Sequence, residues 1–316
     1  MNTDLETPPS PALPPMTGRG GILGAWLRRN PVALKELRGR MRGPRAFLVL
    51  TVYVTLMSVF ATLMYLIYLT TTGLTLNTTG GVIGKLIFGS VVLVEFLLVS
   101  FITPAFTAGA ISGERERRTF ALLRTTLLPA RRLVDGKLLS ALAYVALLLF
   151  VAVPLQSLAF LMGGVTIAEV LLSFELLIVA AVGFGALGIF LSAATGRTLS
   201  ASILSYVTIL LATVVLPLLL VVVGALLGPL TYQRPSLEAL LTYLLNLLGA
   251  SNPIGAAVLT EIALQQHGPA LFYTQTLSNG ASIPLIAPWI VFTLVYGVIS
   301  LVLIRLTVRL VRRTEA

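Results

Sequence analysis

Six long apolar runs dominate the sequence, and each is long enough to cross a lipid bilayer. A helix needs about 20 apolar residues to span roughly 30 Å of hydrocarbon. Lipid offers no partner for backbone polar groups, so each run must be helical. The 316-residue chain is 57% hydrophobic and only 11% charged, below the roughly 25% typical of soluble domains. The sequence therefore predicts an all-α integral membrane protein with six transmembrane helices, at Ala46–Leu69, Val82–Ala110, Lys137–Gly163, Thr166–Thr195, Leu199–Gly228 and Pro284–Val308.

The distribution of positive charge predicts the direction of these crossings. The six spans are separated by segments that alternate between the two sides of the membrane. Of the 22 lysines and arginines, all but Lys85 and Arg234 lie on one side, in residues 1–45, 111–137 and 196–198 and in the C-terminal tail. By the positive-inside rule, both termini are expected to be cytoplasmic, and residues 229–283 to lie outside. This topology also explains the net charge of +10. A nucleic-acid partner is not expected, because it would need one continuous basic face.

The segment before the first run predicts a helix lying at the membrane surface. Residues 1–27 are largely polar and Pro-rich, and are expected to form a disordered cytoplasmic tail. Residues 28–45 have the pattern of an amphipathic interfacial helix, with apolar and basic sides near lipid headgroups. Asn30 suits its N-cap and Pro31 its first turn. Its charged residues include Lys35, Glu36 and Arg38. The alternative is a basic flank that only sets topology.

Several short motifs resemble functional signatures but lack the required context. Residues 183–188 match G-x-G-x-x-G, but in the middle of an apolar run and not after a strand. Small residues there instead predict a face for close helix packing, formed by Ala181, Gly185 and Gly188. The chain contains no complete phosphate-binding loop and no hydrolase or metal-site motif. We therefore expect no enzyme activity in this chain, and no metal or cofactor bound by it.

Two glutamates lie deep inside predicted spans. An ionised side chain at the bilayer centre costs about 2.5–3.5 kcal/mol on insertion scales, and such residues usually face a cavity or a partner. Glu95 and Glu175 are therefore candidates for a translocation path. The alternative is a protonated or hydrogen-bonded glutamate packed between helices. Prolines are expected to kink three of the spans, at Pro104, Pro154 and Pro217.

The long segment 229–283 predicts two short helices. Residues 236–249 begin with a capping serine and end at a glycine, and residues 252–268 begin with Asn-Pro and end at Gly268. Each is too short to span the membrane. They are expected either to dip into the outer leaflet or to cover the bundle.

A charged stretch, GERERRTFALLRTT (113–126), separates the second and third runs. Together with the surface helix and six spans, it resembles the permease subunit of type-2 ABC transporters, mostly exporters. NPVALKELRGRMR (30–42) is similar to the entry helix of that family, and GERERRTFALLRTTLLPARRLVDGK (113–137) to its cytoplasmic signature. The family often has Gly-Thr where this chain has Arg118-Thr119. It also often has Pro directly after the second Thr, where Leu127-Leu128 precede Pro129 here.

The resemblance implies a permease domain over residues 46–316, with residues 111–137 as the cytoplasmic coupling segment. A separate ABC subunit, which binds ATP and Mg, would dock there. A second permease subunit, identical or different, would complete the transporter in the plasma (cell inner) membrane of a bacterium. The residues expected to contact the ATP-binding subunit are Glu114, Glu116, Arg117, Arg118, Thr119, Phe120, Leu122, Leu123 and Arg124.

Two other functions stay open on the sequence. An ion- or proton-coupled secondary transporter would use Glu95 and Glu175 and need no ATP-binding subunit. A membrane scaffold would transport nothing. Co-purification with an ATP-binding subunit separates the first interpretation from both.

Overall fold

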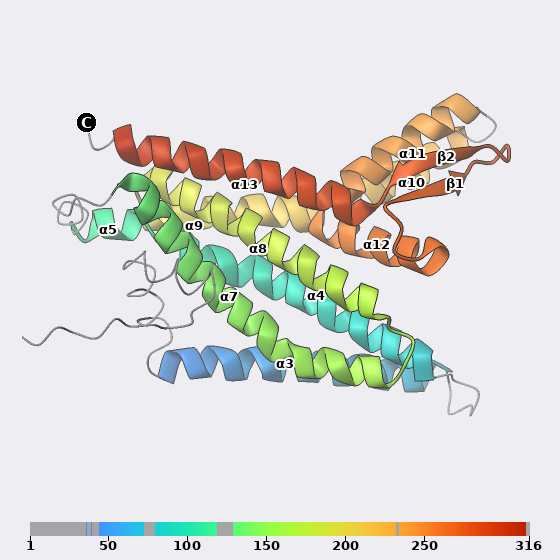
Figure 1. Cartoon of the computed structure of the whole chain (residues 1–316), viewed down its shortest axis with the longest axis horizontal. Coiled ribbons are helices and arrows are strands. Elements are labelled where there is room, and N and C mark those ends of the chain that lie inside the picture. The colour runs from blue at the N-terminus through green and yellow to red at the C-terminus, as the bar shows by residue number, and fades with distance from the viewer. Residues whose placement is uncertain are drawn as a thin grey trace, which may run out of the picture.

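The computed structural model describes residues 36, 39, 44–72, 80–118, 129–231 and 234–313 (Figure 1). Within these ranges, six helical segments are long and apolar enough to cross a membrane, which confirms the predicted spans. Five of the six are single helices or begin in one, and the fifth in chain order is divided by a π-helical segment. They are α3 (Pro44–Thr72), α4 (Gly80–Thr107), α7 (Ala130–Leu161), α8 (Ile167–Thr195), α9–η1–α10 (Thr198–Leu210, Leu211–Val215, Leu216–Thr231) and α13 (Pro288–Arg313).

Helix α8 lies at the centre of the bundle and contacts α4, α7 and α13. Glycines on α8 make these contacts close. A Cβ atom at Gly188 would lie 2.1 Å from Thr107 Oγ1 of α4, and one at Gly183 would lie 2.4 Å from Tyr296 Cδ1 of α13. At Gly185 it would lie 2.9 Å from Leu138 Cδ1 of α7. The G-x-G-x-x-G motif is therefore a helix-packing face, as predicted.

The turn between α7 and α8 is seated against the start of α4. Gly163 and Gly164 adopt positive φ values of 87° and 82°. A Cβ at Gly164 would lie 2.0 Å from the carbonyl oxygen of Gly81, and one at Gly84 would lie 2.1 Å from the carbonyl oxygen of Gly163. Only glycine permits so close an approach of two backbones. The α4, α7 and α8 helices are thus joined at this end of the bundle.

The fifth span is interrupted by the π-helical segment η1, which ends two residues before Pro217. In a π-helix the carbonyl of residue i accepts from the N–H of residue i+5. For Ala212 that residue is Pro217, which has no N–H. The Asn252 side chain supplies the missing donor, because its Nδ2 donates to the Ala212 carbonyl. Its Oδ1 accepts from Gly255 N at 2.9 Å, so Asn252 also caps the helix that begins at Pro253.

Beyond the fifth span, two short helices and a β-hairpin cover the end of the bundle opposite α5 (Ser112–Glu116) (Figure 1). The helices are α11 (Pro235–Ala250) and α12 (Pro253–His267), bent by 118° relative to one another. They match the two predicted short helices within a few residues. The antiparallel hairpin pairs β1 (Phe272–Thr276) with β2 (Ser282–Ile286), and the sequence did not predict it.

The hairpin changes the predicted start of the last span. Pro284 lies in β2, opposite Thr274, and α13 begins only at Pro288. The apolar residues of β2 extend the apolar run of α13, so β2 and α13 form one hydrophobic segment in the sequence. The turn signal was present in Ser278-Asn279-Gly280, where Gly280 has a φ of 82°, as hairpin turns often require.

Candidate coupling site

The charged stretch after the second span folds back onto the helix bundle. α4 ends at Thr107, a turn follows, and α5 continues the chain in Ser112–Glu116. The backbone N–H groups of Ile111 and Ser112 both donate to Ser192 Oγ of α8, at 3.0 Å each. The Oγ atoms of Ser112 and Ser192 lie 3.1 Å apart, and both residues are fully buried. These contacts fix the start of α5 to the end of α8.

Two charged side chains of α5 lie at the ends of neighbouring helices. The Glu116 carboxylate accepts from both Thr198 N and Thr198 Oγ1, at 2.8 Å each, at the start of α9. Arg115 Nη1 donates to the Ala193 carbonyl near the end of α8, at 3.1 Å. A carboxylate at a helix N-terminus and a cation at a C-terminus both complement the helix dipole. The alternating charges of α5 therefore bind the α8–α9 corner.

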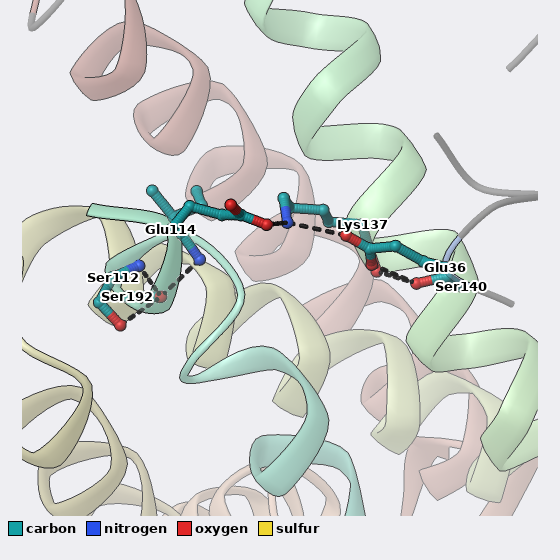
Figure 2. Close-up of polar contacts among 7 residues, drawn as sticks. Glu36, Ser112, Glu114, Lys137, Ser140 and Ser192 are labelled. Atoms are coloured by element: carbon teal, nitrogen blue, oxygen red, sulfur yellow. Dashed lines mark hydrogen bonds and ion pairs between the residues drawn. The ribbon is translucent and has the colours of Figure 1, made fainter. Parts of the chain in front are cut away.

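A buried lysine connects α5 to α7 and to the N-terminal segment (Figure 2). Lys137 is only 4% exposed. Its Nζ lies 2.8 Å from Glu36 Oε1 and 3.3 Å from Glu114 Oε1. Ser140 Oγ, one turn along α7, donates to Glu36 Oε2 at 3.0 Å. Because a buried charge is costly unless it is paired, this cluster holds three distant segments together.

The helix α7 begins at Ala130, two turns before the predicted start of the third span at Lys137. Pro129 precedes it in extended conformation with a φ of −65°, which suits a helix start. Asp135 and Arg131 form an i,i+4 ion pair of 3.5 Å within these turns. Part of the predicted coupling segment is therefore the first part of a spanning helix, because this helix begins before the apolar run that defines the span.

Four of the predicted coupling residues lie within the described part of the chain: Glu114, Glu116, Arg117 and Arg118. Arg118 follows α5 and has a φ of 57°, a left-handed value that non-glycine residues rarely adopt. This is the position at which the resembling family often has glycine. The other predicted coupling residues lie outside the described residues: Thr119, Phe120, Leu122, Leu123 and Arg124.

The predicted surface helix has two described residues, Glu36 and Gly39, and both are helical. Both line a cavity of about 440 Å³ beside α5, together with Glu114 and Lys137. The structure therefore places Glu36 against the bundle and not only at a lipid surface. The other residues named for this helix lie outside the described residues: Asn30, Pro31, Lys35 and Arg38.

The two intramembrane glutamates bind different partners within the bundle. Glu95 of α4 is fully buried, and Gln156 Nε2 of α7 donates to its two carboxylate oxygens at 3.0 and 2.8 Å. Glu175 of α8 accepts from Thr293 Oγ1 of α13 at 2.8 Å. Sequence reasoning found the glutamates but not these partners, which are far along the chain. Their role in a translocation path stays a prediction.

Sequence comparisons place this architecture in a known family. A comparison with curated proteins found no match. The model of the family described as ABC-2 family transporter protein matches residues 30–309, which include most of the predicted surface-helix segment, nearly all of the six spans, and the charged stretch. With a match over most of its length, the chain belongs to the ABC-2 transporter family, whose members are the membrane components of ABC transporters.

Proposed function

We propose that this chain is the permease subunit of an ABC exporter in a bacterial plasma membrane, driven by a separate ATP-binding subunit. Family membership supports the permease role. The sequence contains no complete phosphate-binding loop, so in this proposal another chain binds the ATP. Two permease subunits and two ATP-binding subunits would form the working transporter, with ATP and Mg bound by the latter.

The observation that carries this proposal is the attachment of α5 to the bundle. Residues 111–116 contact α8 through Ser192, α9 through Thr198 and α7 through Lys137. A partner docked on this side of the membrane would thus act on three spanning helices at one point. The adjoining residues 119–128 include Phe120 and Leu123, whose spacing suits insertion into a groove of the partner.

Transport then requires that ATP favour one arrangement of the helices over another. A ligand shifts a conformational equilibrium only by its difference in affinity for the two states. ATP-dependent closure of the two partners would provide that difference, and the permease would alternate between openings on opposite sides. Under this mechanism the contacts of α5 must survive the cycle, because they transmit the movement.

Docking can be tested by truncating the apolar residues of the coupling segment. We expect the double variant Phe120→Ala/Leu123→Ala to lose the ATP-binding subunit in a pull-down and to lose transport. Interface anchors of this kind cost about 2 kcal/mol or more when truncated, which weakens binding more than tenfold. The variant should still reach the membrane, because insertion depends on the spans.

Two controls make the result specific. Thr125→Ala/Thr126→Ala changes the same segment without removing an apolar anchor, and it should retain the partner. Glu116→Gln keeps the apolar anchors but weakens the contact with Thr198, so it should bind the partner better than Phe120→Ala/Leu123→Ala does and still reduce transport. Retention of both partner and full transport by the Phe120→Ala/Leu123→Ala variant would show that this segment is only a topological signal.

A further inference from the structure

A pocket of about 500 Å³ lies between α4, α8 and α12, at the end of the bundle opposite α5. Its volume is in the range of pockets that hold drug-sized molecules. It extends along α4 from Val82 to Phe96, a length of about 20 Å at 1.5 Å per helical residue. Most of the lining is apolar, including Phe88, Val92, Phe96, Leu172, Leu176 and Ile254. Its shape therefore fits an elongated apolar body.

The end of the pocket near the start of α4 is polar and carries an excess of negative charge. Lys85 Nζ lies 3.2 Å from Glu169 Oε1 and 3.3 Å from Glu261 Oε1. The second oxygen of Glu169 accepts from Thr166 N at 2.9 Å, where it completes the capping box of α8. Glu261 Oε1 also accepts from Gln265 Nε2 at 2.7 Å, and Glu261 Oε2 has no hydrogen-bond partner among the described residues. One lysine thus neutralises only one of two carboxylates.

Two further residues of the lining differ from the apolar side chains around them. Thr260, which lines the pocket from α12, is 3% exposed, and its hydroxyl has no hydrogen-bond partner among the described residues. Gly89 lines the pocket from α4, and a Cβ there would meet nothing within 4 Å. Unlike the glycines of α8, Gly89 is not required by close packing. A side chain at this position would project into free space.

From this arrangement we infer that the pocket binds a lipophilic cation, with its apolar body along α4 and its charged nitrogen beside Glu261. The free carboxylate oxygen would accept from, or pair with, the cationic head. An anionic head would be repelled by the net negative charge of the cluster. A free amphiphile and a lipid with an amine headgroup share this chemistry.

The test uses a photoreactive dodecyltrimethylammonium carrying a diazirine at the end of its tail. The purified chain is placed in phosphatidylglycerol nanodiscs, labelled over a range of probe concentrations and digested, and labelled peptides are identified by mass spectrometry. We expect saturable labelling of peptides from α4, α8 and α12. Unlabelled dodecyltrimethylammonium should displace the probe, and dodecyl sulfate should not.

Two variants change the site in different ways. Glu261→Gln removes the charge that pairs with the ligand but leaves Lys85 with Glu169, and Gly89→Leu fills the apolar space. Each should raise the half-saturating probe concentration at least tenfold, which corresponds to about 1.4 kcal/mol. Glu238→Gln is the matched control, because Glu238 lies on α11 at the same end of the molecule and does not line the pocket. It should leave labelling unchanged.

The source of the ligand is resolved by adding phosphatidylethanolamine to the nanodiscs. Displacement of the probe identifies a lipid headgroup as the occupant, and no displacement identifies a free amphiphile. Labelling that is insensitive to both pocket variants, or equally displaced by dodecyl sulfate, overturns the inference. No ATP-binding subunit is needed for this measurement, so the pocket and the proposed function can fail independently.

Discussion

At the scale of single residues, the charges of α5 have partners inside the chain. Glu116 binds Thr198, and Glu114 pairs with Lys137. The sequence suggested that these glutamates would form the rim of an interface with another subunit. A charge reversal at either position would therefore disturb the bundle as well as any docking. This is why the docking test relies on Phe120 and Leu123, whose predicted role concerns the partner alone.

Arg118 provides a prediction about backbone conformation. Its φ of 57° costs a residue with a Cβ roughly 1–2 kcal/mol, and glycine avoids this strain. We expect Arg118→Gly to raise the free energy of unfolding by about 1 kcal/mol, measured by thermal unfolding of the purified protein. Arg118→Ala removes the same charge but keeps the Cβ, so it should give no such gain. Equal stabilisation by both variants would assign the effect to charge.

Glu95 provides a second prediction, based on its contact with Gln156. A glutamine at position 95 can still pair with this amide, so Glu95→Gln should unfold within about 1 kcal/mol of the wild type. Glu95→Leu leaves the buried Gln156 amide without its partner and should cost about 1–3 kcal/mol. Both values come from thermal unfolding. If Glu95→Gln instead lowers transport at unchanged stability, Glu95 belongs to a translocation path.

At the scale of elements, Asn252 connects the broken fifth span to α12. It caps α12 and also satisfies the carbonyl that Pro217 leaves without a backbone donor. The sequence indicated Asn252 as the start of a helix but did not indicate its contact with the Ala212 carbonyl. The π-helical segment was also not predicted, since hydropathy does not distinguish α from π geometry. Pro217, where a kink was expected, lies two residues after the end of this segment.

The contact between Asn252 and Ala212 predicts a coupling between two substitutions. Asn252→Asp keeps a good N-cap but loses the donor to the Ala212 carbonyl, which should cost about 1–3 kcal/mol of unfolding free energy. Pro217→Ala restores a backbone N–H near that carbonyl. In the Pro217→Ala background, Asn252→Asp should therefore cost less, by 0.5 kcal/mol or more in a double-mutant cycle of unfolding energies. Strictly additive effects would contradict this account.

At the scale of the whole molecule, the charge distribution predicts which end of the bundle faces the cytoplasm. The chain has no cysteine, so single cysteines can be introduced and labelled without background. We expect a cysteine at Arg124 to react with a membrane-impermeant maleimide only after the cells are opened. A cysteine at Asn279, in the hairpin turn at the opposite end, should react in intact cells. The reverse pattern would invert the topology.

Much of the architecture followed from the sequence because hydropathy and charge are properties of consecutive residues. The six spans and two short helices were found for this reason. The contacts that organise the site were not, because they join residues far apart: Glu116 with Thr198, and Lys137 with Glu36. The hairpin was not predicted because its apolar strand β2 directly precedes the apolar helix α13. The pocket was missed because its lining comes from three separate helices.

The glycine contact between Gly164 and Gly81 has a mechanical consequence when it is considered with the serine contact at the other end. α4 and α8 are fastened to one another near both tips, by the α7–α8 turn at one end and by Ser112 and Ser192 at the other. Two helices that are fixed to one another near both ends cannot slide past each other, but they can still rotate together. A force applied at α5 would therefore tilt α4 and α8 as one stiff lever, and its largest displacement would emerge on the far side of the membrane, beside α12.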